Sequence, residues 1–160
     1  MERYDDQLNK LSTDGVEVDE CSLMGSKLPG LYIEDKDQPP VVMINPSLSP
    51  REKSCILAEE AGHHYRTCGK IIRLSDAWKR KQERTARAWG FEYRAPLEEI
   101  AQAWLNGANT IWDLADELGI TEKFLVAALD YYRERYGILA ELPDDVYVQL
   151  DPYFDVYKDE

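Results

Sequence analysis

The stretch ILAEEAGHHY, residues 56–65, contains both histidines of the chain and two consecutive glutamates. In a helix, Glu59 and His63 lie one turn apart on the same face, where two side chains can hold one metal ion. Glu60 follows Glu59, and its carboxylate can take a proton from a water that the metal activates. The pattern is H-E-x-x-H with Glu in place of the first His, so it predicts a metal site on a helix.

The residues before this stretch predict where its helix begins. In SPRE, residues 49–52, Ser is a good N-cap, Pro suits the first helical position, and Glu completes a capping box. We expect the helix to end near Cys68 and Gly69. Gly62 lies inside the helix at a cost of roughly 1 kcal/mol relative to Ala. This glycine indicates either the close approach of another group to the helix surface or simple tight packing.

The segments on either side predict an α+β fold. Alternating and β-branched residues before the helix predict three short strands and a small antiparallel sheet, near residues 16–18, 31–33 and 41–44. Caps and glycine stops after it predict four helices, at residues 75–94, 96–105, 110–118 and 121–136. The segment from Pro143 is expected to be a strand or an ordered tail. We expect one domain over residues 1–160, with a core at about 15–137 and an acidic C-terminal segment at 138–160.

Composition limits the partners and the compartment. The net charge of −12 repels nucleic acid and anionic membranes, so neither is an expected partner. Cys21, Cys55 and Cys68 have no C-x-x-C spacing, which argues against a zinc finger or a disulfide framework and suits a reducing compartment. The charged start of the chain is unlike a signal peptide, and no apolar run reaches membrane-spanning length. We therefore expect a cytoplasmic protein.

The helix expected at residues 75–94 provides a third metal ligand. Its apolar stripe is formed by Trp78, Gln82, Ala86, Trp89 and Tyr93, and Glu83 lies at the edge of this stripe beside small residues. With Glu59 and His63, Glu83 completes a set that can hold Zn²⁺ or another divalent metal. Zinc lowers the pKa of a bound water from about 15.7 to about 7, and Glu60 is then the general base.

These residues resemble the ImmA/IrrE metallopeptidases, which occur with phage-type and mobile-element repressors. EEAGH, residues 59–63, is similar to the family's H-E-L-G-H helix. ERTARAWGFEYRAP, residues 83–96, is similar to its second helix, E-x-x-A-N-x-F-A-x-E-L-L-x-P. The resemblance covers about residues 15–137. It implies that His63 and Glu83 bind zinc, that Glu60 is the base, and that the substrate is a helix-turn-helix repressor encoded nearby.

Glu59 stands where the family has His. Pairing Glu60 with His64 instead would put Ala61 in the place of the base, so we keep the first register. Two carboxylates and one imidazole leave a nearly neutral site that acidifies water less than two imidazoles do. His64 lies about 100° round the helix from His63, and we expect it to be a neighbour of the site or a hydrogen-bond partner on the substrate side rather than a ligand.

Three alternatives compete with a zinc-dependent endopeptidase. The first is a catalytically inactive metal-binding relative that regulates a protein partner. The second is a helix-turn-helix DNA reader built on LADELGIT, residues 114–121, although the following helix has a core-like stripe and balanced charges. In the third, there is no site: Glu59 and Glu60 are solvated residues of the helix face, and the two histidines are partly buried packing groups. Metal content separates the enzyme from the DNA reader, and activity separates it from the inactive relative.

Overall fold

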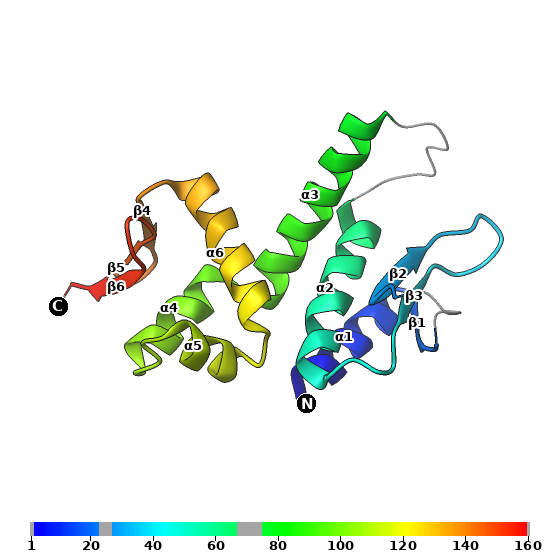
Figure 1. Cartoon of the computed structure of the whole chain (residues 1–160), viewed down its shortest axis with the longest axis horizontal. Helices are drawn as coiled ribbons and strands as arrows, with labels where there is room; N and C mark the ends of the chain where they lie inside the picture. Colours follow the sequence, from blue (N-terminus) through cyan, green and yellow to red (C-terminus); the bar gives the residue numbers. More distant parts are fainter. Residues whose placement is uncertain (1, 23–26, 67–74, 160) are drawn as a thin grey trace. The chain divides into compact units, whose positions relative to one another are not determined.

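The structure, a computed structural model, describes residues 2–22, 27–66 and 75–159 (Figure 1). It divides into two compact units, Met1–Gly90 and Phe91–Glu160, and the division falls within helix α3. One domain over residues 1–160 stays a prediction. The described elements are, in order, α1 Glu2–Thr13, β1 Glu17–Glu20, β2 Gly30–Ile33, β3 Val41–Ile44, α2 Pro50–Arg66, α3 Asp76–Arg94, α4 Leu97–Leu105, α5 Ile111–Leu118, α6 Glu122–Tyr136, β4 Leu139–Leu142, β5 Val146–Gln149 and β6 Asp155–Lys158.

The sheet of the first unit has the order β1-β3-β2 and is mixed. β2 runs antiparallel to β3, as predicted, but β1 runs parallel to β3, so the prediction of a fully antiparallel sheet is wrong. The chain passes from β1 to β2 at the far edge of the sheet and returns through β3 between them. Val42 and Ile44 of this central strand are fully buried, whereas Val41 and Met43 on its other face are half-buried.

Helices α1 and α2 pack with this sheet around one apolar core. The core residues are Leu11, Val16, Val42, Ile44, Leu57 and Ala61. A buried polar pair joins the two helices: Gln7 Nε2 donates to the Ser54 carbonyl at 2.9 Å, and Ser54 Oγ donates to Gln7 Oε1 at 2.7 Å. Both polar side chains are thus satisfied inside the unit, and α2 is fixed against α1.

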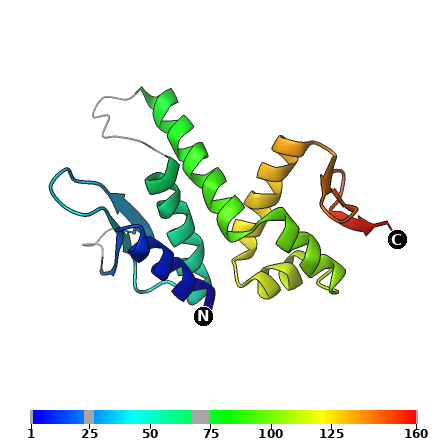
Figure 2. The ribbon, with the colours of Figure 1, turned by 180° about the vertical axis from the view of Figure 1, so that it is seen from behind.

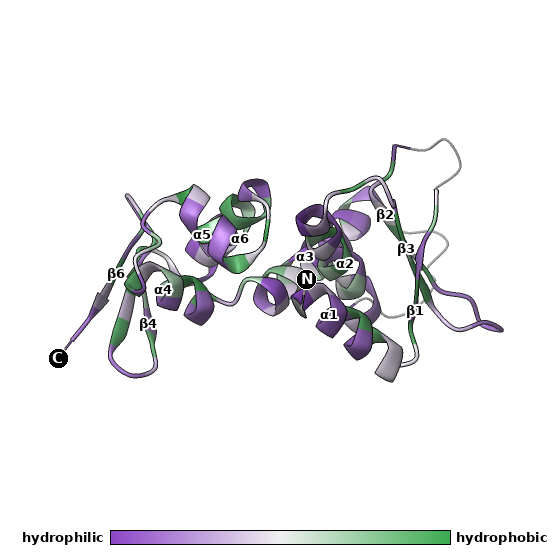
Figure 3. Cartoon of the chain, turned by 90° about the horizontal axis from the view of Figure 1, so that it is seen from below, coloured by the Kyte–Doolittle hydropathy of each residue, from purple (hydrophilic) through white to green (hydrophobic). Residues whose placement is uncertain are grey.

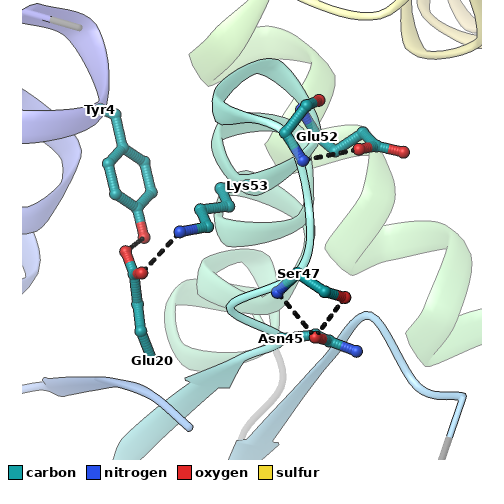
Figure 4. Close-up of polar contacts among 7 residues, drawn as sticks. Tyr4, Glu20, Asn45, Ser47, Glu52 and Lys53 are labelled. Carbon is teal, nitrogen blue, oxygen red and sulfur yellow. Dashed lines mark hydrogen bonds and ion pairs between the residues drawn. The ribbon is translucent and has the colours of Figure 1, made fainter. Parts of the chain in front are cut away.

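The predicted start of α2 is confirmed. The Ser49 backbone N–H donates to Glu52 Oε2 at 2.7 Å, and the Glu52 N–H donates to Ser49 Oγ at 3.3 Å. One turn on, Lys53 donates to Glu20 Oε2 at 2.6 Å, while Tyr4 donates to Glu20 Oε1 at 2.8 Å (Figure 4). The N-terminal end of α2 is therefore tied to both α1 and β1. The expected end of the helix at residues 68–69 lies outside the described residues.

Helices α2 and α3 lie side by side in both views (Figures 1 and 2). A Cβ atom added at Gly62 of α2 would lie 2.1 Å from the carbonyl oxygen of Ala86 in α3. One added at Gly90 of α3 would lie 3.0 Å from the carbonyl oxygen of Ala58 in α2. Gly62 therefore allows the close approach of the α3 backbone to the surface of α2, and this tight packing brings the side chains of both helices together.

The second unit contains α4 to α6 and an antiparallel sheet of order β4-β5-β6. The helices predicted at residues 110–118 and 121–136 are present, and each is capped: Thr110 accepts from the Asp113 N–H, and Thr121 accepts from the Phe124 N–H. Hydrophobic and hydrophilic residues alternate along α5 and α6 (Figure 3). The apolar stripe of α6 is buried as predicted and comprises Phe124, Leu125, Ala128, Leu129 and Tyr132. After α6, the C-terminal segment forms the strands β4, β5 and β6, so it is a small sheet rather than a tail.

The described helices carry no membrane-spanning segment, because none of them is both long enough and apolar enough.

Candidate active site

Four side chains form two contacts between α2 and α3. On α2, Glu59 and His63 are one helical turn apart, and on α3 Glu83 and Arg87 are likewise one turn apart. His63 Nε2 lies 3.6 Å from Glu83 Oε2, and Arg87 Nε lies 3.7 Å from Glu59 Oε1. The structure therefore brings His63 and Glu83 together, and it places Glu59 against an arginine.

His63 and Glu83 fit a shared metal ion. Two ligands of a tetrahedral zinc, each about 2.0 Å from the ion, lie roughly 3.3 Å apart, which is close to the 3.6 Å between these two atoms. The Glu83 side chain is 63% exposed, so this position is open to solvent. Glu59 comes from the same face of α2, but its carboxylate contacts Arg87. Among the described residues, no three of His, Cys, Asp and Glu form a metal-binding group.

Glu60 reaches strand β2. Its Oε2 accepts a hydrogen bond from the Tyr32 backbone N–H at 2.9 Å. Burial raises the pKa of Glu60 to about 7; the Tyr32 N–H opposes this rise, and the charges of Glu59 and Glu83 add to it. A Cβ atom at Gly30 would lie 3.1 Å from Glu60 Cγ, so a residue without a side chain lets the carboxylate approach the strand.

Tyr32 is a neighbour of Glu60 and of both histidines. Its hydroxyl lies 3.0 Å from His64 Nδ1, and its ring is parallel to that of His63 at a centroid distance of 6.5 Å. Its ring meets His64 edge-on at 5.8 Å. Burial, with a smaller contribution from the charge of Glu34, raises the pKa of the Tyr32 hydroxyl to about 12. The hydroxyl therefore stays protonated at neutral pH and is available as a hydrogen-bond donor.

Tyr32 and Arg87 are not among the site residues predicted from the sequence, although the sequence carries a signal for each. Strand alternation places Tyr32 on the opposite face from Leu31 and Ile33, which are 40% and 42% exposed. Arg87 is four residues after Glu83, just as His63 is four residues after Glu59. Once His63 of α2 faces Glu83 of α3, the residues one turn away on the two helices, Glu59 and Arg87, face each other as well.

The comparison with protein families agrees with this geometry. The family model Peptidase_M78, described as the IrrE N-terminal-like domain, matches residues 12–130. No curated protein matches the chain. The family match spans β1 to β3, all of α2 and α3, and every predicted site residue. Because it covers most of the chain, including the whole candidate site, the chain belongs to the Peptidase_M78 family of IrrE N-terminal-like metallopeptidases.

Proposed function

We propose that this chain is a zinc-dependent endopeptidase in which Glu59, His63 and Glu83 hold the metal and Glu60 is the general base. The observation that carries the proposal is the 3.6 Å separation of His63 Nε2 and Glu83 Oε2 across the α2–α3 contact. Membership of a peptidase family, generally metal-dependent, supports the class of reaction. Glu60, adjacent to Glu59 and turned toward β2, supports the division of roles between ligands and base.

Zinc, when bound, supplies a positive centre that makes water a nucleophile near neutral pH. Glu60 accepts a proton from the attacking water and later delivers it to the nitrogen of the leaving amine. The Tyr32 backbone N–H fixes the Glu60 carboxylate, because a hydrogen bond at 2.9 Å restricts its rotation. The Tyr32 hydroxyl positions His64, to which we assign a hydrogen bond with the substrate. Glu59, as a ligand, would share its carboxylate with Arg87 or exchange Arg87 for the ion.

The proposed substrate is a protein, a helix-turn-helix repressor encoded nearby, as the family resemblance implies. The net charge of −12 supports a protein partner over duplex nucleic acid. Co-expression of the chain with the neighbouring repressor is expected to yield defined fragments, and the Glu60→Gln variant is expected to leave the repressor intact. An intact repressor with a zinc-loaded wild-type chain would refute this substrate.

The Glu59–Arg87 contact favours a second candidate function. A chain whose first ligand is held by a guanidinium can act as a metal-binding regulator that binds a protein without cleaving it. Elemental analysis of the tag-free chain, with about one zinc per chain expected, is the first test of either function. Zinc binding together with a stable, uncleaved repressor complex would support the regulator. Failure to bind zinc after loading would refute both.

A further inference from the structure

The Glu59–Arg87 pair and the His63–Glu83 pair lie on consecutive turns of the same two helices. Arg87 Nε is 3.7 Å from Glu59 Oε1; the Glu59 side chain is 27% exposed, and that of Arg87 is 50% exposed. The Glu59 side chain is thus partly shielded from water, while the Arg87 side chain is half exposed to water. The positive charge of Arg87 therefore contacts Glu59, which is one of the three proposed metal ligands.

The charge of Arg87 is permanent. A guanidinium keeps its proton at every pH at which proteins fold, and it offers several N–H donors to a carboxylate. In the metal-free chain its charge offsets that of Glu59, which together with Glu83 raises the pKa of the neighbouring Glu60 carboxyl by repulsion. A divalent cation that takes Glu59 Oε1 as its ligand must displace this guanidinium. One that takes the other oxygen binds beside a positive charge. Both effects weaken metal binding.

We infer that Arg87 controls metal loading: its guanidinium competes with a divalent cation for the Glu59 carboxylate, so the site fills only at a higher free metal concentration. The inference rests on the metal site of the proposed function. It assigns regulation to a residue of this chain that would bind neither metal nor substrate. Removal of Arg87 is expected to leave the ligands in place and to release Glu59 for the ion.

The test is a calorimetric titration of the chelator-stripped, full-length chain with Zn²⁺ alone. Arg87→Gln, which keeps a long polar side chain without the charge, is expected to bind zinc about tenfold more tightly than the wild type. The matched control is Arg84→Gln, since Arg84 is an exposed arginine of the same helix; its affinity is expected to stay within about twofold of the wild type. Far-UV circular dichroism checks that both variants are folded.

Salt provides a second readout that a purely structural role of Arg87 would not change. At about 1 M salt, where the screening length is about 3 Å, the ratio of the two affinities is expected to shrink toward one. Equal zinc affinities of the wild type and Arg87→Gln at low salt would overturn the inference and leave the proposed function intact. An equal increase in zinc affinity in Arg84→Gln and Arg87→Gln would also overturn it, because the increase would then come from the lower positive charge of the whole chain and not from the contact with Glu59. If no folded variant binds zinc, the metal site itself is refuted, and with it the inference.

Discussion

Replacement of Gly62 by Ala tests the contact on which the site is built. Ala is intrinsically better than Gly inside a helix by roughly 1 kcal/mol, so an uncrowded position would gain stability. At Gly62, however, the new Cβ atom would lie 2.1 Å from the Ala86 carbonyl oxygen and 2.7 Å from its carbonyl carbon. Both are backbone atoms of α3, so the clash can be relieved only by moving one helix away from the other.

The size of the effect follows from these distances. Overpacking a close-packed interior costs about 1–3 kcal/mol or more, and a contact with backbone belongs at the upper end of that range. After the intrinsic gain of Ala is subtracted, we expect Gly62→Ala to lower the free energy of unfolding by about 2 kcal/mol. For a domain of this size, this corresponds to a fall in melting temperature of about 4–8 °C. The separation of α2 from α3 should also weaken zinc binding, because His63 and Glu83 are on different helices.

Gly90→Ala is the matched control, since Gly90 is also a buried glycine at the α2–α3 contact. Its Cβ atom would lie 3.0 Å from the Ala58 carbonyl oxygen, a crowding that a shift of a few tenths of an ångström relieves. The intrinsic gain of Ala offsets much of this cost, so its stability is expected to stay within about 1 kcal/mol of the wild type. Thermal unfolding of the metal-free chains, followed by circular dichroism, measures both. A Gly62→Ala variant as stable as the wild type, or no less stable than Gly90→Ala, would refute the reasoning.

Three further predictions concern carboxylates. Glu60→Gln is expected to abolish cleavage while keeping the zinc content, since the base is lost and the ligands remain. Loss of zinc from this variant would show that Glu60, and not Glu59, is the ligand. Glu59→Ala is expected to lose most of the metal in elemental analysis, and Glu59→His to slow the extraction of zinc by chelators; unchanged zinc retention in both would remove Glu59 from the ligands. Glu20 has its pKa lowered by hydrogen bonds from Lys53 and Tyr4, so its contribution to stability is present above its unfolded pKa of about 4.3 and is lost as the pH falls through the folded value. Glu20→Gln should therefore flatten the acid side of the stability curve, and an unchanged curve would contradict this.

The parts of the fold that the sequence predicts well are those fixed by local interactions. The capping box at residues 49–52 involves groups three residues apart, so the start of α2 can be found without knowing its neighbours. The caps at Thr110 and Thr121 are equally local. The strand order β1-β3-β2 is not local, because nothing in strands of four residues specifies which neighbour each will have. The parallel pairing of β1 with β3 therefore could not be predicted from the alternation of residues.

The candidate site shows the same division. The spacing of Glu59 and His63 within one helix is visible in the sequence, and the contact of His63 with Glu83 follows once α2 and α3 are packed through Gly62. The contact of Glu60 with Tyr32 depends on the approach of β2 to α2, which involves residues 28 positions apart. Helical periodicity carries no information about that distance. The position of the carboxylate against the strand therefore became known only from the structure.

The hydrogen bond between Glu60 and Tyr32 also bears on self-association. β2 is at an edge of its sheet, and the unpaired N–H and C=O groups of an edge strand can template the addition of a strand from another molecule. At Tyr32 the backbone N–H already donates to a carboxylate of the chain's own helix. A foreign strand that added there would have to displace Glu60 and bring its own carbonyl oxygen close to that carboxylate. The residue proposed as the base thus also occupies one of the N–H groups that strand addition at this edge would need.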